Sequence, residues 1–280
     1  MVTGAGRGLG RAYAEHATAA GAAVVVNDVD EEEAEAVAAS LRGAVASGHD
    51  VADPLGAADL VALARRELGG IDGLVNNAGL YYEAAPWDED AERARRLVEV
   101  NVLGPLLCTA AAARAFREQG SGGAIVNATS GALFGFPSLG TYGASKGAIA
   151  SLTRATALDL AELGVRVNAI APIAATRLTL AAQVGFRHVP DGASRPPLEG
   201  IERRTPDRIA PLVTFLLSPL AHGITGQVFR FDGTRLSRLD FGDPAGVDAT
   251  RQDAWDVEAV AAALRPESPP TPESNERRAR

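Results

Sequence analysis

The sequence has little cysteine, few aromatic residues and no excess of basic charge. Cys108 is the only cysteine among 280 residues, so no internal disulfide can form, which is typical of a reducing, cytoplasmic compartment. The net charge is −8, whereas nucleic-acid-binding domains usually carry a basic face, so we expect no nucleic-acid partner. The four histidines are scattered and form no cluster with metal-ligand spacing, so no metal site is predicted.

Long apolar runs are also missing. A membrane-spanning helix shows about 18 or more consecutive apolar residues, and no run in this sequence reaches that length. The first residues lack the basic-then-apolar pattern of a secretory signal. We therefore expect no membrane partner. What the sequence does have is 46% apolar residues, which is enough for a full core.

Short apolar segments alternate with helical patterns along most of the chain. Strands are predicted at 22–28, 43–51, 71–79, 122–130, 165–172 and 226–233. Helices are predicted from the second strand to about residue 41, and at 54–69, 88–119, 141–163 and 206–218. Parallel strands joined by right-handed helical crossovers give this alternation. The sequence therefore predicts an α/β fold, a Rossmann-type doubly wound parallel sheet in three α/β/α layers, as a single domain.

The domain boundaries follow from where the alternation stops. Residues 1–235 are assigned to the nucleotide-binding domain, and within it residues 177–205 lack periodicity, as a lid, a binding loop or a disordered segment would. Residues 236–264 are a C-terminal extension, in which 256–265 has the pattern of a short helix. The polar, proline-rich residues 265–280 are predicted to be a disordered tail.

The stretch VTGAGRGLG at residues 2–10 joins an apolar strand to a helix. The strict G-x-G-x-x-G pattern is not met, because Leu9 stands at its third glycine position; the glycines that fit a wider spacing are Gly4, Gly8 and Gly10. Glycines there let the backbone approach a phosphate at the helix N-terminus. Asp28 follows at the end of the second strand, where an acid binds the adenosine ribose and repels a 2′-phosphate, which favours NAD over NADP.

Further residue patterns occur in the order that they have in one enzyme family. They are Thr3-Gly4-Ala5-Gly6-Arg7-Gly8-Leu9-Gly10, Asp50-Val51, Asn76-Asn77-Ala78-Gly79, Asn101, a hydroxyl residue near 130, Tyr142-x-x-x-Lys146, Asn168 and Pro172. Over residues 1–235 the chain resembles the short-chain dehydrogenases/reductases. The resemblance implies a nicotinamide cofactor, an alcohol or ketone substrate, and a homodimer or homotetramer formed through the helices at 88–119 and 141–163 and the last strand.

Tyr142 and Lys146 lie one helical turn apart. A free tyrosine has a pKa near 10, and a nearby ammonium favours the phenolate, so Tyr142 is expected to act as general base or acid. The resemblance implies that Lys146 also binds the nicotinamide ribose and that Asn101 holds a water of a proton relay. Asn101 can alternatively fill a helix kink beside Gly104-Pro105, and both roles are compatible.

The hydroxyl partner of Tyr142 has two candidates. The family's serine usually lies thirteen residues before the tyrosine, which gives Thr129. Counting along the strand from Asn127, by the family's Asn-x-x-Ser spacing, gives Ser130. Ser130 is preferred because loops absorb deletions whereas strand register does not, and neighbouring strand residues face opposite sides.

The resemblance assigns further cofactor contacts, which are Gly4, Arg7, Gly8, Leu9, Gly10, Asp28, Asp50, Val51, Asn77, Ala78, Gly79, Tyr142, Lys146, Pro172, Ile173 and Thr176. Two of these depart from the family's pattern, because Ile173 replaces a usual glycine and Thr176 comes one place early. Arg7 contacts a phosphate or solvent, although in some relatives an arginine there helps to bind NADP. A third departure is the first strand, because only three residues precede Gly4; either the start lies upstream or the domain begins with a stub that lowers stability.

The substrate is the least constrained part. Residues 177–208 hold six arginines (177, 187, 195, 203, 204, 208) against four acids (Asp191, Glu199, Glu202, Asp207), which hints at an anionic substrate such as a carboxylate or acyl-CoA. Leu133, Phe134 and Phe136 either line an apolar pocket or pack a loop. The leading hypothesis is an NAD-dependent oxidoreductase; the alternatives are a non-catalytic NAD-binding regulator and an NADP-dependent oxoacyl reductase.

Overall fold

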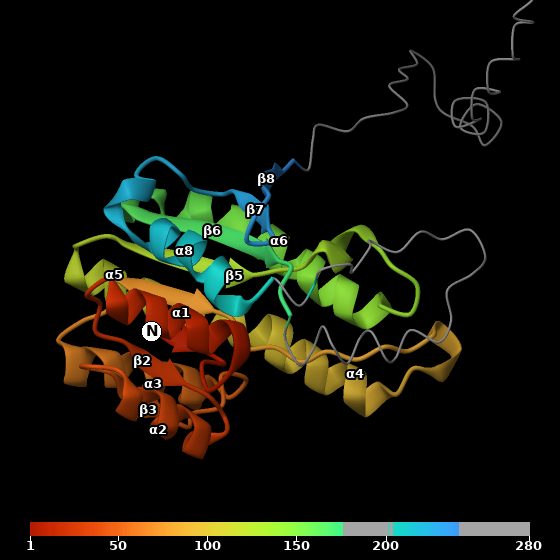
Figure 1. The fold of residues 1–280 in the computed structure, drawn as a ribbon, viewed down its shortest axis with the longest axis horizontal. Coiled ribbons are helices and arrows are strands. Elements are labelled where there is room, and N and C mark those ends of the chain that lie inside the picture. The colour runs from red at the N-terminus through yellow and green to blue at the C-terminus, as the bar shows by residue number, and fades with distance from the viewer. Residues whose placement is uncertain (176–200, 202–203, 241–280) are drawn as a thin grey trace, which may run out of the picture. The chain divides into compact units, whose positions relative to one another are not determined.

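The computed structural model describes residues 1–175, 201 and 204–240. Figure 1 shows a central sheet with helices on both faces. The sheet has eight strands in the order β3-β2-β1-β4-β5-β6-β7-β8, and every neighbouring pair is parallel except β7 with β8. The predicted doubly wound α/β fold is thus confirmed. The strand order reverses between β1 and β4, and such a reversal opens a crevice at the carboxyl ends of the strands.

The strands are short and mostly buried. They are β1 (Val2–Thr3), β2 (Val25–Asn27), β3 (Val45–Ser47), β4 (Gly73–Asn76), β5 (Gly123–Ala128), β6 (Val165–Pro172), β7 (Val228–Phe231) and β8 (Leu236–Leu239). The helices are α1 (Gly8–Ala19), α2 (Glu31–Ser40), α3 (Pro54–Leu68), α4 (Ala91–Val98), α5 (Gly104–Gln119), α6 (Gly140–Asp159) and α8 (Pro206–Leu217). Short turns of 3₁₀ helix are η1 (Pro86–Asp88), η3 (Gly131–Phe134), η4 (Ala161–Leu163) and η6 (Pro219–Ala221).

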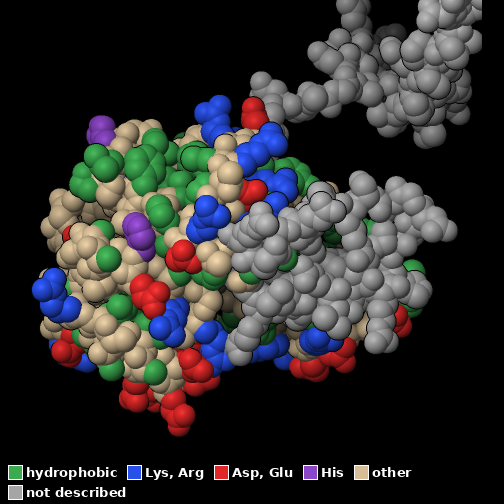
Figure 2. Space-filling view, viewed as in Figure 1, with side chains coloured by type: hydrophobic (Ala, Val, Ile, Leu, Met, Phe, Trp, Pro, Cys, Tyr) green, Lys and Arg blue, Asp and Glu red, His purple; other side chains and the backbone are tan. Residues whose placement is uncertain are grey.

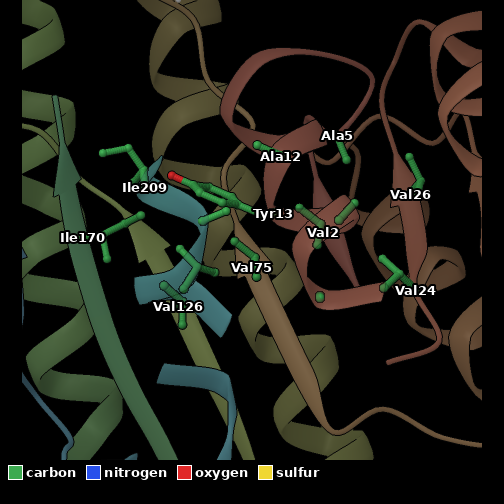
Figure 3. Close-up of a cluster of buried hydrophobic side chains, with 14 of the residues drawn as sticks. Val2, Ala5, Ala12, Tyr13, Val24, Val26, Val75, Val126, Ile170 and Ile209 are labelled. Carbon is green, nitrogen blue, oxygen red and sulfur yellow. The ribbon is translucent and has the colours of Figure 1, made fainter. Parts of the chain in front are cut away.

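Alternate residues of the central strands face opposite sides of the sheet and build two cores. Val75 and Val126 belong to the core under α1, α2 and α8, whereas Leu74 and Ile125 belong to the core under α3, α5 and α6. Figure 3 shows the first core, with Tyr13 of α1 at its centre. Because both faces are covered, the strands read as continuous apolar runs.

The sheet does not stop where the sequence predicted. The compact unit runs from Met1 to Leu239, because β8 pairs antiparallel with β7 beyond the predicted boundary at residue 235. The helix predicted at 256–265 and the tail at 265–280 lie outside the described residues, as does most of the segment 177–205. β1 has only two residues; both pair with β2, and Val2 also pairs with β4.

The predicted interruption in the helix at 88–119 takes a definite form. A stretch of π-helix, η2 (Glu99–Leu103), joins α4 to α5 and carries Asn101. Through this joint the helices form one run, Ala91–Gln119, which by length and composition alone could cross a membrane. Half of the most apolar part of this run is buried inside the fold, as in a helix that packs against the core. Cys108 is buried in this helix, and burial raises the pKa of its thiol to about 12.

Candidate active site

The glycine loop after β1 fits closely against the turn after β4. Gly4 has φ +61°, and a Cβ there would lie 2.8 Å from the Cα of Ala78. A Cβ at Gly10 would lie 2.1 Å from the carbonyl oxygen of Gly4. Gly8, with φ +58°, begins α1. A side chain at Gly4 or Gly10 would collide with backbone atoms, so only glycine fits at these two positions.

Hydrogen bonds hold the ends of β1 and β4 together. The Thr3 hydroxyl accepts from the backbone N–H groups of Asn77 at 3.0 Å and Ala78 at 3.1 Å. The Asn77 side-chain amide donates to the carbonyl oxygens of Thr3 at 3.0 Å and Gly4 at 3.1 Å. The side chain of Asn77 therefore supports the loop, while Ala78 packs against Gly4.

Asp28 lies at the end of β2 beside the glycine loop. Its carboxylate accepts from the backbone N–H groups of Gly6 at 3.0 Å and Asp30 at 3.1 Å. Arg7 turns to two other acids, with ion pairs of 2.5 Å to Asp30 and 3.0 Å to Glu33. Acidic side chains gather on this end of the molecule, over α2 (Figure 2). The charge around Asp28 is therefore predominantly negative.

Asp50 and Val51 follow β3 and reach toward α4 and α5. The carboxylate of Asp50 pairs with Arg96 at 2.7 Å and accepts from the Ala52 N–H at 2.9 Å. Burial alone would raise the pKa of Asp50, but these two partners bring it below its ordinary value. Val51 is buried, and its Cγ2 lies 2.9 Å from where a Cβ on Gly104 would stand, so these two elements are in close contact.

Tyr142 and Lys146 share one face of α6, near the carboxyl ends of β4 and β5. The Nζ of Lys146 lies 5.7 Å from the centroid of the Tyr142 ring and donates to the carbonyl oxygen of Ala128 at 3.0 Å. Burial lowers the pKa of Lys146 to about 8. Burial also raises the pKa of Tyr142, and a hydrogen bond with Ser130 lowers it in part. The pKa of Tyr142 is thus raised, whereas the charge of Lys146 alone would lower it.

The two candidate hydroxyls near Tyr142 face different ways. Thr129 is buried, and its hydroxyl donates to the carbonyl oxygen of Lys146 at 2.6 Å, so it bonds to the backbone of α6. Ser130 hydrogen-bonds to the Tyr142 phenol and caps η3 by accepting from the Ala132 N–H at 3.2 Å. Of the two, the geometry favours Ser130.

Asn101 lies fully buried in η2 with its amide in use. Its Oδ1 accepts from the Leu80 N–H at 2.7 Å, and its Nδ2 donates to the Leu80 carbonyl oxygen at 2.9 Å and to the Ser145 hydroxyl at 3.1 Å. The amide therefore fixes the chain that follows β4. Gly79 lies between two candidate residues, since a Cβ there would stand 3.3 Å from the Asn101 Oδ1 and 3.5 Å from the Lys146 Nζ.

The residue after β6 makes one more backbone hydrogen bond to β7. Pro172 ends β6, and the backbone N–H of Ile173 donates to the carbonyl oxygen of Phe231 at 2.9 Å. Ile173 thus keeps the strand geometry at the position where the family usually has glycine. Thr176 lies outside the described residues.

One residue at the site was not singled out from the sequence. The ring of Tyr81 contacts the ring of Tyr142 edge-to-face, with centroids 4.9 Å apart and an angle of 78°. The Tyr81 hydroxyl donates to Glu83 at 2.5 Å. The sequence signal that could have identified Tyr81 is its position, two residues after Gly79, in the segment that follows the carboxyl end of β4.

Comparison with known proteins identifies the family. A family model described as enoyl-(acyl carrier protein) reductase matches residues 4–233. The crystal structure of a short chain dehydrogenase from Mycobacterium avium superimposes with a TM-score of 0.79 at 32% identity, covering 96% of each chain. The chain belongs to the short-chain dehydrogenase/reductase family. The resemblance seen in the sequence is thereby confirmed.

Curated members of this family include dehydrogenases similar to the chain. The chain is 39% identical over 240 residues to 2-(S)-hydroxypropyl-CoM dehydrogenase 3 of Xanthobacter autotrophicus, covering 83% of this chain and 94% of the relative. It is 38% identical over 244 residues to the cis-4-hydroxycyclohexanecarboxylate dehydrogenase of Sinomonas cyclohexanicum, with the same coverage. As a short-chain dehydrogenase/reductase, the chain is an oxidoreductase that depends on a nicotinamide cofactor.

The residues present fit such a cofactor. Gly4 and Gly10 pack so closely on Ala78, Asn77 and the loop's own backbone that the loop is held tightly against the N-terminus of α1. The absence of a side chain at Gly79 lets the backbone after β4 lie close to Asn101 and Lys146. Backbone N–H groups at a helix N-terminus bind phosphates, so the start of α1 at Gly8 suits the phosphates of a dinucleotide.

Proposed function

We propose that the chain is an NAD-dependent dehydrogenase that interconverts a secondary alcohol and its ketone, with Tyr142 as the general acid/base. One observation carries the proposal: the Tyr142 phenol is hydrogen-bonded to Ser130 while its ring faces the Lys146 ammonium. That arrangement places a proton-transfer group beside a polar hydroxyl and a positive charge. Two relatives are named as dehydrogenases of hydroxy compounds, which agrees with it.

The proton chemistry follows from these neighbours. A bound nicotinamide would supply the hydride acceptor for oxidation of the alcohol and the hydride donor for reduction of the ketone. Tyr142 takes the proton of the alcohol in oxidation and gives it back in reduction. Burial disfavours the phenolate and raises the pKa of Tyr142. The charge of Lys146, together with the positive charge of a bound oxidised nicotinamide, is needed to bring the pKa of this phenol toward neutral pH. Ser130 holds the reacting oxygen at Tyr142.

The remaining polar groups orient and relay. Lys146 holds the nicotinamide ribose through its ammonium, which has a pKa of about 8 and so is mostly charged at pH 7. Asn101 keeps Leu80 and Ser145 in place around Lys146, and we assign to it the relay water that connects Lys146 to solvent. Pro172 and Ile173 line the nicotinamide with backbone, and Thr176 is assigned to its amide.

NAD rather than NADP is proposed because of the charge at the ribose. Asp28 binds the adenosine ribose hydroxyls, and its charge opposes a 2′-phosphate. Arg7, the cation that could have bound that phosphate, is paired with Asp30 and Glu33. Asp50 and Val51 are assigned to the adenine, with Asp50 fixed by Arg96.

An anionic substrate stays a prediction. Of the six arginines that suggested it, only Arg204 and Arg208 lie within the described residues. Arg204 is 3.8 Å from Asp232, whose pKa is lowered by the N–H groups of Arg235 and Thr234 and by the nearby arginines. A relative whose name specifies a hydroxycarboxylate agrees with a carboxylate handle.

A homodimer or homotetramer is proposed from an exposed apolar face. Four large apolar side chains on α4, η2, α5 and α6 are exposed, namely Val98, Leu103, Leu106 and Leu158. Exposed apolar groups on neighbouring helices are typical of an interface between copies. Light scattering after gel filtration measures the assembly, and a strictly monomeric particle at micromolar concentration would contradict it.

The function is tested with two measurements. Thermal shift with NAD and, separately, NADP should show stabilisation by NAD alone, at about 2.7 kcal/mol for a hundredfold excess over the dissociation constant. Formation of NADH from a panel of secondary alcohols that includes 4-hydroxycyclohexanecarboxylate should fall by about 10²- to 10⁴-fold in Tyr142→Phe. Tyr13→Phe, which changes a phenol in the core instead, is the matched control.

The other outcomes distinguish the alternatives. A shift with NADP alone would favour the oxoacyl reductase. NAD binding without turnover of any alcohol or ketone would favour a regulator that binds NAD and does no chemistry.

A further inference from the structure

The residues from Tyr81 to Glu89, here named the 81–89 segment, contact the catalytic helix at three places. The sequence patterns assigned these residues no role. The segment leaves the carboxyl end of β4 and ends one residue before the N-cap of α4, Asp90. Each of its three contacts falls within residues 138–142, at the start of α6, where Tyr142 lies.

The first contact is with the catalytic ring itself. Tyr81 meets Tyr142 edge-to-face with centroids 4.9 Å apart, whereas the Nζ of Lys146 lies 5.7 Å from the same ring centroid. Tyr81 is held in turn, because its hydroxyl donates to Glu83 at 2.5 Å. Burial, Glu83 and Tyr142 together keep the pKa of Tyr81 far above its ordinary value, so Tyr81 stays a neutral phenol. Its contribution to Tyr142 is therefore one of position.

The second contact is between backbones. Ala84 forms an isolated parallel β-bridge with Leu139, and the Ala84 N–H donates to the carbonyl oxygen of Ser138 at 3.0 Å. Ser138 has φ +62°, the only positive φ of a non-glycine residue in the described part of the chain. A serine in that conformation is strained and persists only where its surroundings hold it. The bridge thus fixes the turn directly before α6.

The third contact is a carboxylate clamp. One oxygen of Glu89 accepts from the Tyr82 hydroxyl at 2.6 Å, and the other accepts from the Thr141 hydroxyl at 2.5 Å. The Arg93 guanidinium stacks on the Tyr82 ring at 4.2 Å, and Tyr82 is buried. Thr141 is the neighbour of Tyr142 in the chain. Glu89 therefore ties the end of the segment to the first turn of α6.

Three independent contacts from one segment to one helical turn point to a common task. We propose that the 81–89 segment is a positioning element for Tyr142, in which Tyr81 fixes the ring beside Lys146 and Glu89 secures the segment to α6. The proposal rests on the assignment of Tyr142 as the acid/base. Tyr81 is thus a positioning residue in this reaction.

Movement of the Tyr142 ring would change its titration. The groups that face Tyr142 in the described chain are Lys146, Ser130, and Tyr81 backed by Glu83. Of these, only Lys146 carries a positive charge that favours the phenolate. Lys146 and Tyr142 titrate as a coupled pair, because a phenolate favours the charged ammonium in return. If Tyr81 keeps the ring near Lys146, removal of Tyr81 therefore raises the pKa at which Tyr142 ionises, which a merely structural role would not do.

The test uses the full chain with NAD bound. Tyr81→Ala removes the ring, Tyr81→Phe keeps the ring and removes the hydroxyl, and Trp87→Ala is the control, since Trp87 belongs to the same segment but is 82% exposed. Tyrosinate formation is followed by ultraviolet difference titration, and the step that belongs to Tyr142 is the one missing from Tyr142→Phe. We expect that step to move to higher pH in Tyr81→Ala and to stay in place in Tyr81→Phe and Trp87→Ala.

Turnover gives the second measurement. With the secondary alcohol found active in the panel above, Tyr81→Ala should lower kcat by about tenfold or more, leave the KM for NAD unchanged, and be rescued by phenylalanine. Glu89→Ala and Thr141→Val should each lower kcat several-fold, and the double variant should be no worse than Glu89→Ala, because Glu89→Ala already removes the contact with Thr141. Urea unfolding excludes general loss of stability, and Tyr81→Leu replaces Tyr81→Ala if that variant does not fold.

The results distinguish a failure of the positioning role of Tyr81 from a failure of the acid/base role of Tyr142. A Tyr81→Ala protein with unchanged titration and kcat overturns the positioning role, as does a loss that phenylalanine fails to rescue. Full turnover by Tyr142→Phe overturns the proposed function instead, and the titration step can still be compared among the Tyr81 variants.

Discussion

The proposed cofactor end of the site, around the glycine loop, and its proposed substrate end, around Tyr142, are built in different ways. At the cofactor end, Gly4 and Gly10 meet backbone atoms so closely that no side chain fits, and backbone groups bind Thr3 and Asp28. At the substrate end, side chains meet side chains, as Tyr81 does with Tyr142 and Glu89 with Thr141. The first end suits a ligand that is the same for many enzymes. The second can change with the substrate, because side chains can be exchanged without rebuilding the backbone.

The largest expected effect breaks the backbone fit of the cofactor end. In Gly10→Ala the new Cβ would lie 2.1 Å from the Gly4 carbonyl oxygen and 2.6 Å from the Asn77 Nδ2, so the loop must move. We expect about 3 kcal/mol of destabilisation and about a hundredfold weaker NAD binding. Urea unfolding and calorimetric titration with NAD measure the two effects.

The matched control is Gly147→Ala in α6, where the added Cβ meets nothing within 4 Å. Alanine in the middle of a helix should leave stability unchanged or raise it by about 1 kcal/mol. Wild-type NAD affinity in Gly10→Ala would contradict the close fit on which the comparison depends.

The next effect sharpens what the cofactor end selects. Asp28→Ala removes the charge at the ribose and both backbone hydrogen bonds, to Gly6 and Asp30. The ratio of NAD to NADP affinity should fall by about tenfold or more, because the 2′-phosphate no longer meets that carboxylate. Calorimetric titration with each dinucleotide measures the ratio.

Asp28→Asn separates charge from hydrogen bonding. It keeps an oxygen acceptor and removes the charge, so the same change in ratio is expected with a smaller loss of stability. An unchanged ratio in both variants would mean that Asp28 does not select the dinucleotide.

The two ends also differ in what the sequence could predict. The glycine spacing, the position of Asp28 and the pair Tyr142–Lys146 are local patterns, and the structure places them at the carboxyl ends of neighbouring strands. The contact between Tyr81 and Tyr142 joins residues 61 positions apart through the order of β4 and β5, which no local pattern contains.

Three other features could not be predicted from the sequence, because they depend on tertiary structure. The pKa of Tyr142 is raised because of burial, and burial follows from packing. Arg7 was expected to meet phosphate or solvent, but its partners Asp30 and Glu33 come from α2 and the residues before it. β8 is a four-residue edge strand, too short for its alternation to stand out.

A moderate effect is expected where the two ends meet, at Lys146. Its pKa of about 8, against an ordinary 10.5, means that folding disfavours its charged form. This penalty is complete below pH 8 and disappears as the pH rises toward 10.5, where the unfolded chain loses the proton too. Lys146→Met removes the penalty and one hydrogen bond, so the cofactor-free protein should gain about 1–2 kcal/mol at pH 7.

Urea unfolding of Lys146→Met at pH 7 and pH 10 measures this gain, which should shrink at the higher pH. The same variant should lose turnover, since the charge beside Tyr142 is gone. A gain that is equal at both pH values would show that burial of the ammonium is not its source.

The smallest effect is expected in the core behind the cofactor loop. The Tyr13 hydroxyl is buried and has no hydrogen-bond partner among the described residues, and Figure 3 shows it pointing toward Ile209. Tyr13→Phe removes an unsatisfied polar group and should change stability by less than about 1 kcal/mol, in the favourable direction. Tyr82→Phe is the contrasting variant, because it deletes a hydroxyl that is bonded to Glu89 and should lower stability. If urea unfolding shows Tyr13→Phe to be the more destabilised of the two, the Tyr13 hydroxyl has a partner, such as a buried water, and the core behind the loop is polar at that point.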